Sequence, residues 1–203
     1  MTRRPRGAVG RPAGTLLGVV APFVVAMLMW ILAAPRSELL SVGDGRGLRL
    51  PDSGADGGTQ LVMMVLLMTA AVVCAVLVLW RRHPHLRRPG GVPALMLVPG
   101  LTCAVAAAAA TPLAGVLAAP PRDAPYGAIV HQAPEVGELF FGRMIYGTSG
   151  PSWEWLPPGA GWVVFGAMVA AFTVAVLVHF SPHSTPHVSG EEAPEAAGSR
   201  TGR

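Results

Sequence analysis

Residues 60–80, QLVMMVLLMTAAVVCAVLVLW, decide the fold together with RRHPHLRR, which follows at residues 81–88. The first segment has 21 residues and no charged side chain. As a helix that rises ~1.5 Å per residue, it would span about 31 Å, the thickness of a bilayer's hydrocarbon core. The four arginines that follow favour the cytoplasmic side of the membrane. This stretch therefore predicts an integral membrane protein and the orientation of its other spans.

The composition supports the same class of protein. The chain has 203 residues, of which 52% are hydrophobic and 13% charged, whereas soluble domains carry about 25% charged residues. All fifteen basic residues are arginine, and the formal net charge is +4. Because these arginines lie beside apolar segments, we expect them to set the topology and to contact anionic headgroups. We expect no nucleic-acid partner.

Four apolar segments predict an all-α integral membrane bundle of four transmembrane helices. The predicted spans are about 14–34, 60–80, 92–119 and 161–180. Residues 1–13 are expected to form a disordered basic cytoplasmic arm and residues 181–203 a disordered cytoplasmic tail, which leaves 14–180 as the membrane domain. The first span is longer than a signal-peptide core, so we expect it to stay uncleaved. Ten arginines fall on the proposed inner side and five on the outer side, which favours cytoplasmic N- and C-termini.

Two outer loops connect these spans. The first, residues 36–59, is rich in glycine. Because its aspartates do not follow the register of a calcium loop, we expect a flexible, solvated segment. The centre of the second loop, residues 134–146, predicts a short amphipathic helix with glutamates in its first turn and an apolar face after them. The candidate interaction surface in this loop consists of Pro134, Glu135, Glu138, Phe140 and Phe141.

Tryptophans and small residues predict how the helices sit and pack. Indole rings favour the headgroup region, so the tryptophans near the outer ends are expected to be interfacial anchors. These are Trp30, Trp153, Trp155 and Trp162. Small residues at a spacing of four allow close helix approach, although a GC-rich coding bias would also produce them. They are Gly100, Ala104 and Ala108 in the third span and Ala167, Ala171 and Ala175 in the fourth. Cys74 and Cys103 lie at different predicted depths, which favours packing residues over a disulfide.

Two groups of residues have the side-chain types of a metal or catalytic site. His179, His183 and His187 would share one helix face, but prolines at 182 and 186 interrupt that helix. His131 precedes Glu135 and Glu138 at a spacing that matches no zinc-protease motif. We therefore expect no metal site, no cofactor and no catalytic residues, and the chain is not predicted to be an enzyme.

The spans contain no Asp, Glu, Lys or Arg. Proton relays and ion-coupled transporters generally need ionisable groups within the membrane. This composition counts against transport, although a pore lined by backbone in an oligomer stays open as an alternative.

A family resemblance rests on several short motifs. They are LAAP at residues 32–35, WRRH at residues 80–83 with PG at 89–90, and above all AP at 133–134 followed by FF at 140–141. With them the chain resembles a family of small actinobacterial four-span membrane proteins, known only as a domain of unknown function. The resemblance covers roughly residues 14–180 and implies a four-helix membrane fold and an actinobacterial source. It brings no catalytic residue, and more residues separate AP from FF here than that family leads us to expect.

These observations predict a multi-pass protein of the cell membrane. Its predicted role is that of a non-enzymatic scaffold or accessory subunit at the cell envelope. Its partners would be the lipid bilayer and another membrane or envelope protein that the second outer loop contacts. The alternative from the sequence is a small transporter or channel subunit.

Overall fold

The computed structural model describes residues 10–43, 46–49, 57–117, 124–137, 139–140 and 159–181. In this part of the chain, four helices are long and apolar enough to cross a membrane. They are α1 (Gly10–Ala33), α2 (Gly57–Arg82), α3 (Val92–Leu117) and α5 (Ala160–Phe180). Their bounds lie within a few residues of the predicted spans, so the four-helix prediction is confirmed for length and composition.

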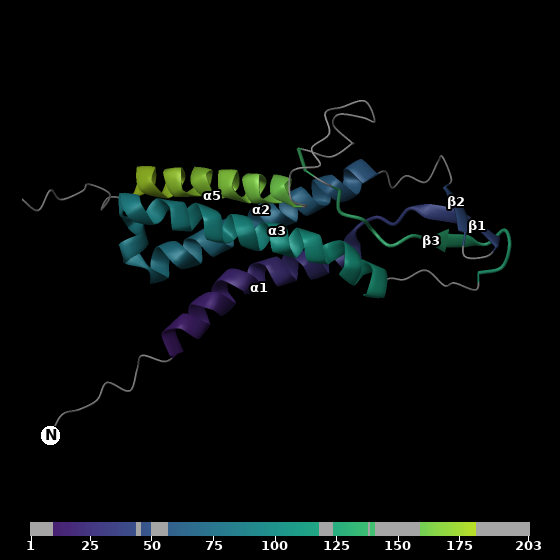
Figure 1. Cartoon of the computed structure of the whole chain (residues 1–203), viewed down its shortest axis with the longest axis horizontal. Helices are drawn as coiled ribbons and strands as arrows, with labels where there is room; N and C mark the ends of the chain where they lie inside the picture. The colour runs from purple at the N-terminus through teal and green to yellow at the C-terminus, as the bar shows by residue number, and fades with distance from the viewer. Residues whose placement is uncertain are drawn as a thin grey trace, which may run out of the picture.

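The helices form a bundle in which α1 packs mainly on α2, and α5 mainly on α3, while α2 and α3 also contact each other (Figure 1). Two short 3₁₀ turns, η1 (Pro84–Arg87) and η2 (Pro89–Gly91), join α2 to α3. We call this end of the bundle the arginine end. The opposite end, where α1 and α3 end and α2 and α5 begin, is called the sheet end.

A small antiparallel sheet extends from the sheet end (Figure 1). Its strands are β1 (Glu38–Gly43), β2 (Arg46–Arg49) and β3 (Ile129–His131), in the order β2-β1-β3. The first loop supplies β1 and β2, and the second supplies β3, so the two predicted outer loops form one structure. The expectation of a flexible first loop is wrong over these strands, because β1 pairs with neighbours on both sides.

The second loop also holds β1 through a turn before β3. The backbone N–H of Ser41 donates to the Ala128 carbonyl at 2.8 Å, and that of Gly127 donates to the Ser41 carbonyl at 2.8 Å. Gly127 has a φ of 82°, which a residue with a Cβ rarely adopts. The buried hydroxyl of Ser41 donates to the Ala124 carbonyl at 3.1 Å. These contacts join segments about 85 residues apart in sequence, as strand pairing between non-local segments requires.

Helices α3 and α5 approach closely through glycines. A Cβ added to Gly166 would lie 2.8 Å from the Cα of Gly100, and one added to Gly100 would lie 3.0 Å from the Val163 carbonyl oxygen. The predicted small-residue stripe is therefore correct at Gly100 and Ala104, which are buried, but wrong at Ala108, which is exposed.

After Gly161 at the start of α5, the next buried small residues are Gly166 and Ala170, one position before the predicted Ala167 and Ala171. Ala175 is exposed. The predicted spacing of four is present, but the sequence did not distinguish between two adjacent faces that both carry small side chains. Cys103 is buried in α3, Cys74 is exposed on α2, and both thiols are free.

Candidate interaction site at the sheet end

A segment of the second loop, residues 133–140, crosses the sheet end of the bundle, and we call it the strap. Within it, Glu138 lies outside the described residues. Residues 134–137 have no helical structure, and residues 139–140 form a turn. The predicted amphipathic helix therefore does not begin at Pro134, and its remainder from residue 141 lies outside the described residues. A proline lacks a backbone N–H, so the extended start of the strap loses no hydrogen bond there.

Gln60, in the first turn of α2, binds the strap and the end of α1 together. Its side chain is 5% exposed. The amide nitrogen Nε2 donates to the Pro35 carbonyl at 2.7 Å, and the oxygen Oε1 accepts from the backbone N–H of Glu135 at 3.4 Å. The buried amide side chain of Gln60 thus forms one hydrogen bond with a backbone group from each of two segments, at Pro35 and at Glu135. Buried polar groups need such hydrogen-bond partners.

Helices α3 and α5 hold the next residues of the strap. The backbone N–H of Val136 donates to the Thr111 hydroxyl at 3.0 Å, and the Trp162 indole donates to the Gly137 carbonyl at 3.2 Å. The backbone of Leu139 then lies directly over Gly161, where an added Cβ would overlap the Leu139 carbonyl oxygen. Glycine at position 161 is therefore required for the strap to contact α5.

The described tryptophans are structural residues, not interfacial anchors. Trp30 is 0% exposed, and its indole donates to the Gln60 carbonyl at 3.0 Å. Trp162 is 2% exposed. The prediction that Trp30 and Trp162 sit in the headgroup region is therefore wrong, because each indole N–H has a protein acceptor and each ring lies in the core. Trp153 and Trp155 lie outside the described residues.

The structure separates the residues of the predicted interaction surface. Pro134 is fully buried, and Phe140 packs against the core with a φ of 67°, which is uncommon for a residue other than glycine. Glu135 is exposed, and its carboxylate accepts from the Gln132 side chain at 2.9 Å. Glu138 and Phe141 lie outside the described residues. Among the described members of this surface, Glu135 is the one that is exposed, whereas Pro134 is buried and Phe140 is partly buried.

An exposed apolar row on the sheet was not predicted. Leu40 of β1 lies opposite both Leu48 of β2 and Ile129 of β3, so the three side chains point to the same face of the sheet. Leu48 is 64% exposed and Ile129 58%. The sequence does contain a signal for this hairpin, because Asp44-Gly45 is a dipeptide typical of a two-residue turn and follows a run containing Leu39, Leu40 and Val42.

The structure places His131 beside a residue of the first loop, a neighbour that the sequence did not suggest, and Glu138 lies outside the described residues. His131 lies opposite Glu38 in the sheet, with the His131 Nε2 3.8 Å from a Glu38 carboxylate oxygen and both side chains about half exposed. His131 thus pairs with the first loop. Within the described residues, no three His, Cys, Asp or Glu side chains lie close enough together to hold a metal ion. His183 and His187 lie outside those residues, so the expectation about metal stays a prediction.

Comparisons of the chain with protein-family models, with curated proteins and with solved structures find no match. The resemblance to the actinobacterial four-span family therefore stays a prediction, and the function has to be argued from the geometry of the chain itself.

Proposed function

We propose that the protein is a non-enzymatic scaffold or accessory subunit that presents the small sheet to another protein of the cell envelope. The observation that carries this proposal is the apolar row Leu40, Leu48 and Ile129 on a sheet whose two loops are held to the bundle. Leu48 and Ile129 are exposed, and Leu40 between them is partly buried. Exposed apolar side chains grouped on one surface are typical of interaction sites. The buried polar side chains at this end, above all Gln60, serve to hold the strap and the loops in place.

The occupant we propose is a second envelope protein. The sheet lies beyond the ends of the helices (Figure 1). A bundle that spans the membrane would therefore hold it next to the membrane surface. The role of small transporter or channel subunit, the alternative from the sequence, stays a prediction that no feature of the described residues favours.

We also propose that the sheet end is outside the cell and that both termini are cytoplasmic. The support is the arginine pattern, because Arg81, Arg82, Arg87 and Arg88 all lie at the opposite end and such clusters stay on the cytoplasmic side. The proposed location is the cell membrane, with four spans.

The test uses a photo-reactive amino acid in place of Leu48, in cells that make the full chain. We expect a covalent adduct with a protein other than this chain, and we expect Ile129→Asp to abolish it because a charge in the apolar row opposes burial against a partner. A membrane-impermeant maleimide should label Leu48→Cys on intact cells if the sheet end is outside.

The matched control places the same photo-reactive amino acid at Glu135, which is exposed on the strap but lies outside the row. An adduct from position 135 alone would move the docking site to the strap and contradict the proposal for the sheet. An adduct with the mass of two copies of this chain would identify self-association, and an adduct unaffected by Ile129→Asp would show that the row does not bind the partner.

A further inference from the structure

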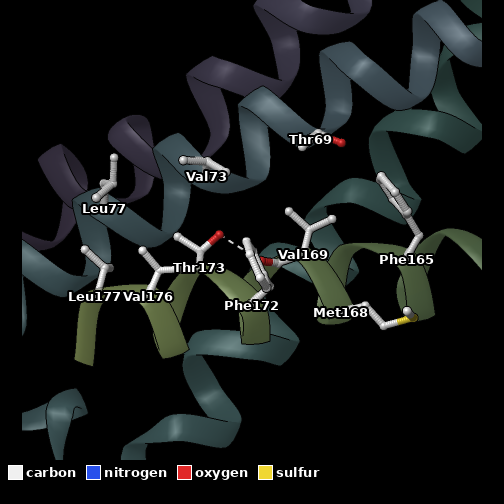
Figure 2. Close-up of a pocket in the computed structure, with 10 residues that line it drawn as sticks. All are labelled: Thr69, Val73, Leu77, Phe165, Met168, Val169, Phe172, Thr173, Val176 and Leu177. Carbon is white, nitrogen blue, oxygen red and sulfur yellow. Dashed lines mark hydrogen bonds between the residues drawn. The ribbon is translucent and has the colours of Figure 1, made fainter. Parts of the chain in front are cut away.

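A groove runs along the bundle between α2 and α5, and Figure 2 shows its lining residues facing one another across it. Its volume is about 580 Å³. The side of α2 contributes Thr69, Val73 and Leu77, and the side of α5 includes Phe165 and Phe172. The two threonines that line it, Thr69 and Thr173, donate their hydroxyl groups to carbonyls of their own helices, at 2.7 Å in each case. The groove therefore offers an apolar surface with no polar group in need of a partner.

The extent of the groove fits one leaflet of a bilayer. Thr69, Val73 and Leu77 follow at intervals of four, which places them along one ridge of α2, and the next position of that ridge is Arg81. At ~1.5 Å per residue, the α2 wall runs from about 6 Å to about 18 Å from Arg81. Half of a hydrocarbon core is about 15 Å thick. An acyl chain that starts near Arg81 would thus lie along the groove.

The arginines at the end of the groove differ in what they contact. Arg87 donates two hydrogen bonds to the Trp80 carbonyl and lies over the Trp80 ring. Arg82 reaches toward α1, because a Cβ added to Gly14 would lie 3.0 Å from its Nη1 atom. Arg81 is exposed and has no hydrogen bond or ion pair with any residue that the structure describes. Because it also lies on the ridge of α2 that lines the groove, it is a cation available to a ligand of the groove.

We propose that the α2–α5 groove binds one acyl chain of an anionic phospholipid whose phosphate group pairs with Arg81. An acyl chain fits better than a second helix for two reasons. The α2 wall covers one leaflet only, whereas a packed helix would follow the full height of the bundle. The lining includes bulky side chains such as Met168 and Phe172, which are 60% and 72% exposed, whereas close helix approach needs small residues.

The test is native mass spectrometry of the purified full chain, titrated with phosphatidylglycerol or with phosphatidylcholine carrying the same acyl chains. We expect one bound lipid, and we expect phosphatidylglycerol to bind with roughly five-fold higher affinity than phosphatidylcholine. A basic residue near an anionic headgroup raises the affinity by about that factor. Arg81→Gln should remove this preference. The matched control Arg82→Gln, with the same charge change one residue later, should keep it.

A second pair of variants tests the groove. Val73→Phe should weaken binding of both lipids because it fills the space for the acyl chain. Ala70→Phe, which fills the separate groove of about 460 Å³ between α1 and α2, should leave binding unchanged.

The proposal is overturned if wild type binds both lipids equally, if Arg82→Gln and Arg81→Gln have equal effects, or if Ala70→Phe weakens binding as much as Val73→Phe. A dimer that Val73→Phe dissociates would identify a second copy as the occupant. Because Arg81 has no partner within the described chain, its variant should fold, and this arm of the test does not depend on core packing.

Discussion

The two ends of the bundle are held by different kinds of contact. At the arginine end, most contacts are local: Arg87 binds the carbonyl of Trp80, and Gly91 lies so close to the backbone of Leu86 that a Cβ added to it would be 2.5 Å from the Leu86 Cα. Two residues of this end reach α1 instead: the His83 Nε2 lies 3.2 Å from the Thr15 hydroxyl, and Arg82 lies beside Gly14. At the sheet end, contacts are long-range: the single side chain of Gln60 forms hydrogen bonds with Pro35, 25 residues away, and with Glu135, 75 residues away.

This difference indicates how each end should respond to damage. A local contact restrains only the turn that contains it, so its loss should fray a helix end. A long-range contact such as that of Gln60 restrains two loops at once, and its loss should release the sheet and the strap together. The predictions below test this contrast, from the largest expected effect to the smallest.

Gly161→Ala should have the largest effect. The new Cβ would overlap the Leu139 carbonyl oxygen, which is backbone and cannot rotate away. We expect a loss of about 3 kcal/mol in the free energy of unfolding, the upper range for overpacking, measured in mixed micelles. Hydrogen exchange should become faster in the strap and in β3, because the strap connects directly to that strand.

The control is Gly115→Ala in α3, where an added Cβ meets no atom within 4 Å. Alanine favours a helix over glycine by about 0.5–1 kcal/mol, so this variant should be equally stable or more stable. If Gly161→Ala were as well tolerated as Gly115→Ala, the strap would not rest on α5 as the structure shows.

Gln60→Leu should have the next largest effect. The change leaves the Pro35 carbonyl and the Glu135 N–H without their partner, and an unsatisfied buried group costs about 1–3 kcal/mol. Since the bond to Glu135 is long, at 3.4 Å, we expect a total loss of about 2 kcal/mol. Faster hydrogen exchange should appear in both loops, around β1 and around the strap.

Thr69→Val is the matched control, because it also replaces a polar side chain of α2 with an apolar one. The Thr69 hydroxyl bonds only to a carbonyl of its own helix, so its loss should change stability by less than about 0.5 kcal/mol. Faster exchange confined to the first turn of α2 in Gln60→Leu would show that the two loops are not coupled through this residue.

The same contrast explains which parts of the structure could be predicted from the sequence. The four helices follow from uninterrupted apolar segments, and the turn between α2 and α3 follows from a short polar segment between two spans. The pairing of β1 with β3 and the path of the strap depend on contacts between distant residues, and no local pattern encodes them. Trp30 and Trp162 show this limit. Their positions near helix ends suggested the headgroup region, whereas the carbonyls of Gln60 and Gly137 provide hydrogen-bond acceptors that only the fold brings within reach.

Arg87→Gln should have the smallest effect and the most local one. The Trp80 carbonyl is among the last four of α2, which have no partner within the helix, and Arg87 donates to it at 2.9 and 3.1 Å. Because Arg87 is exposed, we expect a loss of about 1 kcal/mol or less. Arg87→Lys keeps the charge near the end of the helix but lacks the planar guanidinium group, whose Nε–H and Nη2–H both donate to this one carbonyl oxygen. If the two bonds stabilise this end, lysine should lose nearly as much as glutamine; if charge alone does so, lysine should behave like the wild type. In Arg87→Gln, hydrogen exchange should rise in the last turn of α2 and in η1. In both variants exchange should stay unchanged in the strap, and a rise there would contradict the independence of the two ends.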